Sequence, residues 1–455
     1  NVATRADSRA IVDHDGTALS YAQTANAVAS VAEQIAALNL PPKSEIALLL
    51  PNGSELVVAL LAVMRSGHIA VPMPVAWRKS DLVRACREAE AAALITTANY
   101  GAENLPELAA ETAIEVFELS FPCAFGVPLP DGIVPFSFSA HDERALSNAA
   151  ITSTHSPGIG TLEPASRGVR FVHHRDEELL AAGLGAMLAG DMQSGDRIVS
   201  AISLTTFAGL ASAFVPWLLS GGTLTLLPDL PGKGAVDFDA HTHLIVAAGS
   251  LSALCNTASS AIASAYAVHF AGTEPVTAFP ALNAKAIVDV IALGEVCVIA
   301  LPRRERSMAE PLPLGEIHAG NTGAGSPVIA ETHIENGRIH LRGAMVPKDL
   351  IGDKEWLETD FTADMHDATS LYVTPPEEMI AIGALRFNCP DLERRIRSAA
   401  LVSEVYAVDD PVLGARLIIT SDRPDMTARA LLDAGLPRVV AASVRKADAT
   451  GMKAG

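Results

Sequence analysis

Hydroxyl-bearing residues and glycines gather between residues 151 and 171, in the stretch ITSTHSPGIGTLEPASRGVRF. Thr152, Ser153 and Thr154 lie at its start, and such side chains with flexible glycine backbone suit a loop that holds nucleotide phosphates. The stretch contains no lysine, and Arg167 offers a positive charge of different shape and hydration. Two interpretations stay open, a variant phosphate loop and a surface connector, because small residues and glycine are typical of any loop.

Other residue combinations could carry chemistry but lack the partners that the chemistry needs. The histidine pairs at 173–174 and 241/243 have no further ligands at metal-binding spacing. Gly158 and Gly160 do not belong to a strand–glycine–helix unit with a following acid, so they do not form a dinucleotide fingerprint. The chain has no GxSxG motif, which argues against a serine hydrolase.

Composition limits the class of protein. A chain of 455 residues with 49% hydrophobic and 19% charged residues can bury large cores, and its length predicts two or three domains. The net charge of −19 argues against a nucleic-acid backbone or an anionic membrane surface as the main partner. The five cysteines are widely spaced without a CxxC motif, and no signal peptide opens the chain, so we expect a reducing cytoplasm.

Residues 200–228 carry no charge over a length that could cross a membrane. Ser, Thr, Gly and Pro interrupt this run, and Gly221 and Gly222 are suited to end a helix. We therefore expect a buried strand–helix–strand unit here and a protein that does not span a membrane.

Helical and strand patterns alternate through the first 100 residues and again from residue 175 to residue 295. Ser54 is expected to cap one helix, and residues 100–150 are expected to be irregular. This alternation predicts parallel sheets covered by helices. The expected helices lie at 21–40, 54–67, 79–91, 175–190 and 208–222, and the expected strands at 44–50, 68–73, 92–96, 196–202, 223–227, 242–248, 265–272 and 286–295.

From about residue 310 the pattern changes to short hairpins, and Asn336-Gly337 is a strong hairpin turn. The last 80 or so residues form a separate unit with a helix at 391–400. We therefore predict an α/β protein with a large N-terminal region, which combines parallel or mixed sheets, helices and a β-rich part, and a small α+β C-terminal domain. The predicted boundaries are 1–375, with subdomains of about 1–150, 151–310 and 311–375, and 376–455.

Several stretches carry a family resemblance that covers nearly the whole chain. They include LLLPNGSELVVALLAVMRSGHIAVPMPVAWRKSDL (48–82), SGDRIVSAISLTTFAGLASAFVPWLLSGGTLTLL (194–227), NGRIHLRGAMVP (336–347) and EEMIAIGALRFNCPDLERRI (377–396). These stretches resemble conserved blocks of the adenylate-forming (AMP-binding) superfamily, which includes acyl- and aryl-CoA synthetases such as long-chain fatty-acid–CoA ligases, nonribosomal-peptide adenylation domains and luciferases. The resemblance implies that a carboxylic acid attacks the α-phosphate of ATP, and that a thiol then takes the acyl group.

The resemblance also implies roles for particular residues. Glu295, in IALGE, falls at the magnesium-binding carboxylate, and a single Glu with phosphate oxygens suits that metal. Lys453 stands one residue beyond the expected catalytic lysine. The remaining roles are nucleotide binding for Thr152, Ser153, Thr154, Arg167, Gly272 and Asp360, an acyl pocket for Thr205, Thr206 and Phe207, a hinge at Glu377, and the thiolation loop at Gly383.

The chain departs from the family pattern at several charged positions. Pro375 replaces an arginine, Met452 replaces the terminal lysine, and an alignment without gaps puts Phe361 at the ribose acid, with Asp360 beside it. Two functions stay open. One is an ATP- and Mg²⁺-dependent acid–thiol ligase with weak or atypical ATP use, whose acceptor is coenzyme A or pantetheine on an acyl carrier protein. The other is a non-catalytic acyl- or partner-binding protein with the same fold.

Overall fold

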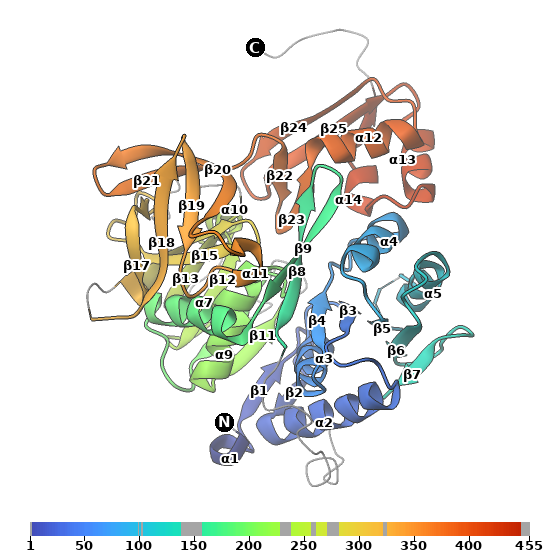
Figure 1. Ribbon diagram of the computed structural model, residues 1–455, viewed down its shortest axis with the longest axis horizontal. Coiled ribbons are helices and arrows are strands. Elements are labelled where there is room, and N and C mark those ends of the chain that lie inside the picture. Colours follow the sequence, from blue (N-terminus) through green and yellow to red (C-terminus); the bar gives the residue numbers. More distant parts are fainter. Residues whose placement is uncertain are drawn as a thin grey trace.

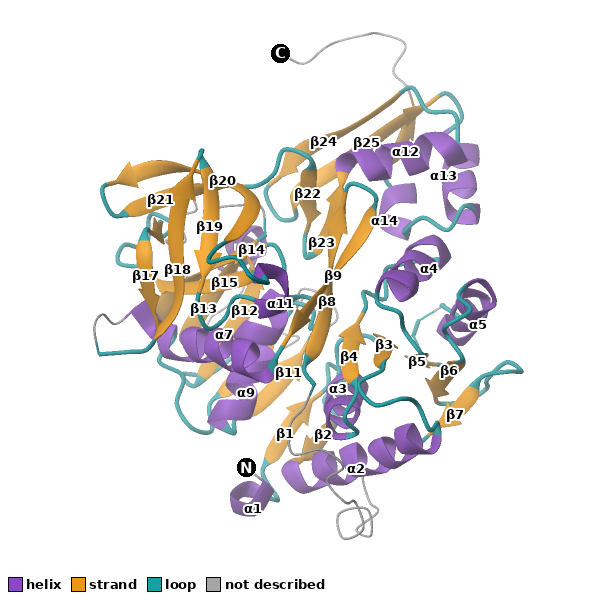
Figure 2. Ribbon diagram, in the orientation of Figure 1, coloured by secondary structure: helices purple, strands orange, loops and turns teal. Residues whose placement is uncertain are grey.

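The computed structural model describes residues 2–98, 100–101, 103–137, 157–227, 238–255, 261–270, 282–321 and 325–446. Figures 1 and 2 show sheets and helices in layers, with the strands that follow residue 375 gathered at one end of the molecule. The α/β class, with a β-rich part and a small α+β unit after it, is confirmed.

The first sheet is parallel except at β9, which returns antiparallel to β8. Within β3, the side chains of Ile46 and Leu48 pack into one core and those of Ala47 and Leu49 into another, because successive strand residues point to opposite faces. In spatial order its strands are β7 (Val134–Phe136), β6 (Phe121–Phe125), β5 (Ala93–Thr97), β3 (Glu45–Leu49), β4 (Ile69–Pro72), β8 (Ile159–Ala165) and β9 (Gly168–His174).

Helices cover both faces of this sheet. On one side lie α2 (Tyr21–Ala37), whose N-terminus has a Ser20–Gln23 capping box, and α3 (Ser54–Arg65). On the other side lie α4 (Lys79–Glu88) and α5 (Leu105–Glu115).

Two local predictions about this layer are wrong. The N-cap of α3 is Gly53, because Ser54 is the first helical residue and uses its amide and hydroxyl to bind the carboxylate of Asp13 at 2.7 and 2.6 Å. Residues 100–150 are not irregular throughout, since α5, β6 and β7 continue the α/β pattern there. Pro106 lies at the start of the helix, and Pro122 and Pro135 lie in the last two strands at one end of the sheet, where the lost N–H donor is tolerated.

The second sheet combines strands from the start of the chain with strands after residue 196. The predicted subdomain boundary near residue 150 therefore does not coincide with a boundary between sheets, because β1 and β2 lie in the second sheet and β8 and β9 in the first. Its order is β15 (Cys297–Pro302), β14 (Ala284–Leu293), β13 (Ile262–His269), β12 (Thr242–Ala247), β10 (Arg197–Ser200), β11 (Thr223–Leu226), β1 (Arg9–Val12) and β2 (Ala18–Ser20).

The uncharged run forms the strand–helix–strand unit that its sequence predicts. Three helical pieces follow one another directly between β10 and β11, and the middle one is a π-helical turn. The segment ends at Gly221, whose φ of 64° is favourable for glycine. None of the helices in the described ranges has the length and apolar character needed to cross a bilayer. The helices around this sheet are α1 (Val2–Arg5), α7 (Asp176–Ala189), α8 (Phe207–Gly209), η1 (Leu210–Phe214), α9 (Val215–Ser220) and α10 (Ala248–Cys255).

The third sheet is antiparallel and contains the predicted hairpin at Asn336-Gly337, where both residues have positive φ angles of 53° and 77°. A short 3-10 helix, η2 (Ala319–Asn321), and α11 (Lys348–Ile351) interrupt its connections. The strand order is β16 (Leu312–Pro313), β21 (Ser370–Thr374), β20 (Leu357–Asp367), β19 (Arg338–Arg342), β18 (Val328–Glu335) and β17 (Gly315–His318).

The strands after residue 375 form a sheet of their own, with an apolar core that includes the fully buried Ile396, Ile419 and Leu431. Its helices α12 (Cys389–Ala399), α13 (Pro424–Asp433) and α14 (Arg438–Ala441) supply part of that core. The strands run in the order β23 (Leu385–Asn388), β22 (Met379–Ile382), β25 (Gly414–Ser421) and β24 (Glu404–Asp410), with β26 (Val444–Lys446) beside β25.

This C-terminal unit packs on α4 through charged side chains. Arg84 makes two hydrogen bonds to Asp391 on α12, at 2.9 and 2.8 Å, and Arg395 pairs with Asp81 at 2.7 Å. Bidentate and partly buried pairs of this kind are stronger than exposed ones. We call these two ion pairs the α4 contact.

We expect a fragment of residues 376–446 to fold alone, because its apolar core is made within the unit. The predicted domain boundary near residue 375 would then be correct. Thermal unfolding followed by circular dichroism should show a cooperative transition, and Ile396→Ala should lower the free energy of unfolding by about 2–5 kcal/mol. A fragment with the spectrum of an unfolded chain would contradict the boundary.

Candidate active site

Glu295 lies in the tight turn between β14 and β15, at the carboxyl edge of the second sheet. The carboxyl ends of parallel strands meet at one edge, so the segment after β10 reaches the same place. The turn requires Gly294, whose φ is 61° and at which an added Cβ would lie 1.9 Å from Glu163 Oε1. The Glu295 side chain is almost fully buried, with 1% of the residue exposed.

Both carboxylate oxygens of Glu295 have partners. The amide of Phe207 donates to Oε2 at 2.5 Å, and the guanidinium of Arg386 donates to Oε1. Burial raises the pKa of Glu295 to about 7, although Arg386, the Phe207 amide and the Thr161 hydroxyl act in the opposite direction. A buried carboxylate with a perturbed pKa and a specific charge partner is characteristic of functional sites.

Glu163 on β8 brings a second carboxylate to this point. Its Oε1 accepts from the amide of Glu295 at 3.2 Å and lies 3.8 Å from Arg386 Nη1. Arg170, opposite on the same hairpin, also pairs with Glu163. Arg386 therefore lies between two carboxylates, with 7% of its side chain exposed.

Arg386 belongs to β23 and therefore comes from the C-terminal unit. This strand lies beside β8, as Figure 1 shows, so the C-terminal sheet places a cation against Glu295. The sequence places Arg386 in the stretch GALRFN at 383–388, but nothing in its spacing indicated a partner 91 residues away.

A neutral histidine supports the same site. The Nε2 of His174 lies 2.9 Å from the hydroxyl of Thr161, and its ring stacks on Phe207 at a centroid distance of 4.1 Å. Burial lowers the pKa of His174 to about 3, so the ring stays uncharged at neutral pH. The Thr161 hydroxyl also lowers the pKa of Glu295, so the histidine and the acid share Thr161 and Phe207 as neighbours.

A cavity of about 600 Å³ lies beside these residues, between the third sheet and the C-terminal sheet. Asp360 and Glu377, predicted at the ribose and the hinge, both line it together with Arg386. Asp360 is largely exposed and lies 3.5 Å from Arg338. The charged lining consists of Glu163, Arg170, Arg338, Asp360, Glu377, Glu378 and Arg386.

The predicted loop at 151–171 is wrong from residue 159 onward. Residues 159–174 form the hairpin β8–β9, which turns through Ser166 and Arg167 only. The first four residues of β8 are buried, with Ile159 packed into one core and Leu162 into the other, and this burial on both faces overrides the loop-like composition. Arg167 is exposed at the turn, and no contact joins it to Glu295 among the described residues.

The other predicted site residues have mixed outcomes. Thr205 and Thr206 are buried near Glu295, but Thr206 caps α8 and Thr205 bonds Ser203, so their role as an acyl pocket stays a prediction. Gly383 forms the β22–β23 turn with a φ of 63°, and its thiolation role is likewise untested. Five predicted residues, Thr152, Ser153, Thr154, Gly272 and Lys453, lie outside the described residues.

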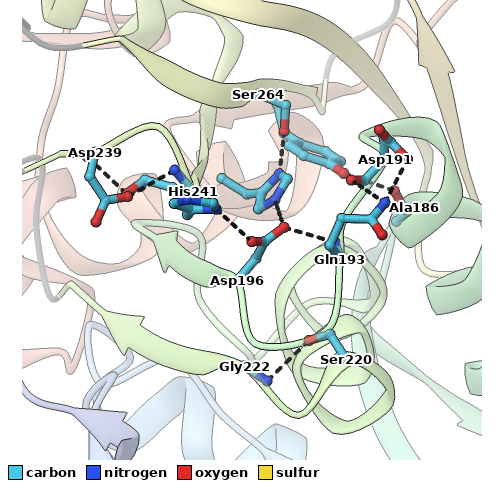
Figure 3. A network of polar contacts seen from close by, with 12 residues as sticks. Ala186, Asp191, Gln193, Asp196, Ser220, Gly222, Asp239, His241 and Ser264 are labelled. Carbon is cyan, nitrogen blue, oxygen red and sulfur yellow. Dashed lines mark hydrogen bonds and ion pairs between the residues drawn. The ribbon is translucent and has the colours of Figure 1, made fainter.

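A serine, a histidine and an aspartate meet at the opposite edge of the second sheet (Figure 3). Asp196 Oδ2 lies 3.0 Å from His243 Nε2, and His243 Nδ1 lies 2.7 Å from Ser264 Oγ. Ser264 and His243 are fully buried, so no acyl substrate reaches the hydroxyl. The three residues cross-link the amino ends of neighbouring parallel strands.

Comparisons with known proteins concern the first part of the sequence and the fold. Residues 1–123 match the family model of the AMP-binding enzymes. The chain superposes on the amide bond synthetase McbA from Marinactinospora thermotolerans with a TM-score of 0.67 and 17% identity, covering 96% of this chain and 93% of the other. For o-succinylbenzoate CoA synthetase from Bacillus subtilis, the TM-score is 0.67 at 14% identity, with 100% and 95% covered. The chain therefore has the fold of these two enzymes, and its first 123 residues match the AMP-binding family model.

Two curated proteins align with part of the chain. Feruloyl-CoA synthase from Amycolatopsis sp is 28% identical over 217 residues, which are 47% of this chain and 40% of that protein. The nonribosomal peptide synthetase ivoA from Emericella nidulans is 26% identical over 242 residues, covering 50% and 14%. The match therefore spans less than half the length of these relatives.

Substitution of Gly294 tests the turn that positions Glu295. Gly294→Ala should lower the free energy of unfolding by about 1–3 kcal/mol, because an L residue is strained at this φ and its Cβ would collide with Glu163. Gly325→Ala is the control, since nothing lies within 4 Å of its added Cβ and its φ is not positive. Equal denaturation midpoints for the two variants would show that the turn is not constrained.

Ser264→Ala tests the structural role of the buried serine. It should lower the free energy of unfolding by about 1–3 kcal/mol, because the Nδ1 of His243 would lose its hydrogen-bond donor. Hydrolysis of a p-nitrophenyl ester should be the same in wild type and variant. An esterase activity that disappears with Ser264 would contradict the structural assignment.

Proposed function

We propose that the protein activates a carboxylic acid with ATP as an acyl-adenylate and transfers the acyl group to a thiol, either coenzyme A or the pantetheine of a carrier protein. The observation that carries the proposal is the buried Glu295, held at the carboxyl edge of the sheet beside the cavity that Asp360 and Glu377 line. The match to AMP-binding enzymes and the ligases and synthetases among the similar proteins favour an enzyme over the non-catalytic alternative.

Adenylation depends on positive charge around the phosphates and on in-line placement of the attacking carboxylate. The cavity supplies three arginines, but four carboxylates share its lining, and each arginine has a carboxylate partner. An excess of negative charge repels a triphosphate. This balance supports the proposal that ATP use is weak or atypical, because the cations are already compensated within the protein.

Magnesium would supply the missing positive charge between the phosphates and Glu295. The residues do not fit the metal while Arg386 is in place, because both oxygens of Glu295 are hydrogen-bonded. No group of three or more potential metal ligands occurs in the described part of the chain. Glu295 and the neighbouring Glu163 would fit the metal only after Arg386 has moved away. Phosphate oxygens and water would then complete the coordination.

The similar proteins suggest which acids to test first. Two of their names refer to feruloyl and o-succinylbenzoate groups, both of which are aromatic. We propose an aryl acid as the substrate class.

Pyrophosphate exchange over a panel of aryl and fatty acids with Mg²⁺-ATP tests the proposal. We expect exchange well below about 10 s⁻¹, the usual turnover of enzymes. Glu295→Gln should lower the rate by about 10²–10³, the usual effect of losing a well-placed electrostatic group. Glu118→Gln, at an exposed carboxylate, is the control and should not change the rate.

Two results would contradict the proposal. Exchange at about 10 s⁻¹ on an ordinary acid would show that ATP use is not weak. Absence of exchange with every acid, together with no thermal shift on adding Mg²⁺-ATP, would support the non-catalytic function.

A further inference from the structure

A cavity of about 390 Å³ lies against β10, β11 and β1 of the second sheet and shares no lining residue with the cavity beside Glu295. Leu224 and Leu226 of β11 pack into the large core on one face of these strands. Thr223 and Thr225 alternate with them, so they lie on the other face, where they line the cavity. Strands of a parallel sheet are typically apolar on both faces. Two threonines on one face of β11 therefore indicate that this face meets polar groups.

The hydroxyl of Thr225 is buried without a partner. Only 2% of the residue is exposed, and its Oγ1 has no hydrogen bond to any of the described residues. The neighbouring Thr223 differs, because its hydroxyl donates to the carbonyl of Arg9 at 3.1 Å. A buried polar group that lacks a hydrogen bond destabilises the folded state. The Thr225 hydroxyl therefore requires a polar partner, and the cavity that this residue lines is the place for one.

Two arginines flank these threonines. Arg9 belongs to β1 and Arg197 to β10, the two strands beside β11, and both residues line the cavity. Neighbouring strands lie about 4.8 Å apart, so the two backbones are about 10 Å apart and both side chains can reach one ligand between them. The guanidinium of Arg9 makes no hydrogen bond or ion pair within the part of the chain that the structure describes. The exposed His14, in the turn after β1, lines the same cavity.

The acids of the cavity are already hydrogen-bonded to neutral groups. Both oxygens of Asp13 accept from Ser54, one from its amide and one from its hydroxyl. Asp239 Oδ1 accepts from the amide of His241 at 3.0 Å and from the hydroxyl of Thr242 at 2.8 Å. The lining therefore offers a ligand mainly guanidinium, imidazole and hydroxyl groups, and these groups suit an anion.

We propose that this cavity binds a small organic anion, whose carboxylate or phosphate group lies between Arg9, Arg197 and Thr225. Guanidinium groups bind both kinds of anion through strong charge-assisted hydrogen bonds. Val12 and Leu227 also line the cavity and suit a short apolar part of the same molecule. The cavity volume is typical of small-molecule sites. The inference goes beyond the proposed function, because the site is separate from the candidate active site.

Isothermal titration calorimetry with butyrate and with inorganic phosphate, in the absence of ATP, tests the proposal. Binding of butyrate alone would identify a carboxylate as the anionic group, and binding of phosphate alone would identify a phosphate. Arg9→Gln should weaken the binding of the anion about tenfold, because a charge-assisted hydrogen bond is lost. Thr225→Val should weaken binding less, since it removes a hydrogen bond from a neutral group.

The matched control is Arg429→Gln, because Arg429 is an exposed arginine on α13 of the C-terminal unit. This variant should bind both anions as the wild type does. Equal affinity in wild type and Arg9→Gln, or no binding of either anion to the wild type, would overturn the proposal.

The stability of Thr225→Val gives an independent readout. Without an added anion, its thermal midpoint should equal or exceed that of the wild type, since valine keeps the shape and removes a hydroxyl without a partner. A clearly lower midpoint would show that the protein itself satisfies the hydroxyl, and would overturn the proposal.

Modification of histidines by diethyl pyrocarbonate, followed by mass spectrometry, locates the bound anion. The anion should protect His14, while the exposed His366 of the third sheet should react at the same rate with and without it. Unchanged reaction of His14 in the presence of a bound anion would overturn the location. None of these measurements uses ATP, so they are independent of the test of adenylation.

Discussion

A carboxylate removed from water must receive hydrogen bonds and positive charge, or the folded state loses several kcal/mol. Glu295 is such a carboxylate, and the arrangement of the molecule around it follows from this requirement. Its two oxygens receive an amide from the start of α8 and a guanidinium from β23, which lie 88 and 91 residues away in the chain. The acid therefore joins the second sheet to the C-terminal unit.

Buried, hydrogen-bonded acids lie at both edges of the second sheet, and they differ in whether a ligand can reach their partners. At the amino edge, Asp196, His243 and Ser264 form a hydrogen-bonded chain that is buried and holds strands together. At the carboxyl edge, Glu295 is equally buried, but its partner Arg386 lines an open cavity. Only the second arrangement gives a ligand access to the charged groups.

The fold is that of the adenylate-forming enzymes, while the charges around the cavity are largely satisfied within the protein. The β8–β9 connection is a two-residue turn, and Glu163 just before it faces Glu295 and Arg386. The hairpin therefore contributes a carboxylate to the site, where the resemblance implied phosphate-binding groups. A scaffold of this class can keep its layers with different chemistry, because the core is set by apolar burial and the site by a few polar side chains.

The sequence by itself determined the α/β class, most helices and strands of the parallel sheets, the Asn336-Gly337 hairpin and the place of Glu295 at a strand end. These features depend on local periodicity, turn chemistry and order along the chain. It misjudged residues 159–171, because a glycine-rich composition suits both a loop and the edge hairpin β8–β9. Only the tertiary structure brought Glu163, Thr161, His174 and Arg386 to Glu295, since contacts between residues far apart in the chain depend on how sheets pack, which no local pattern records.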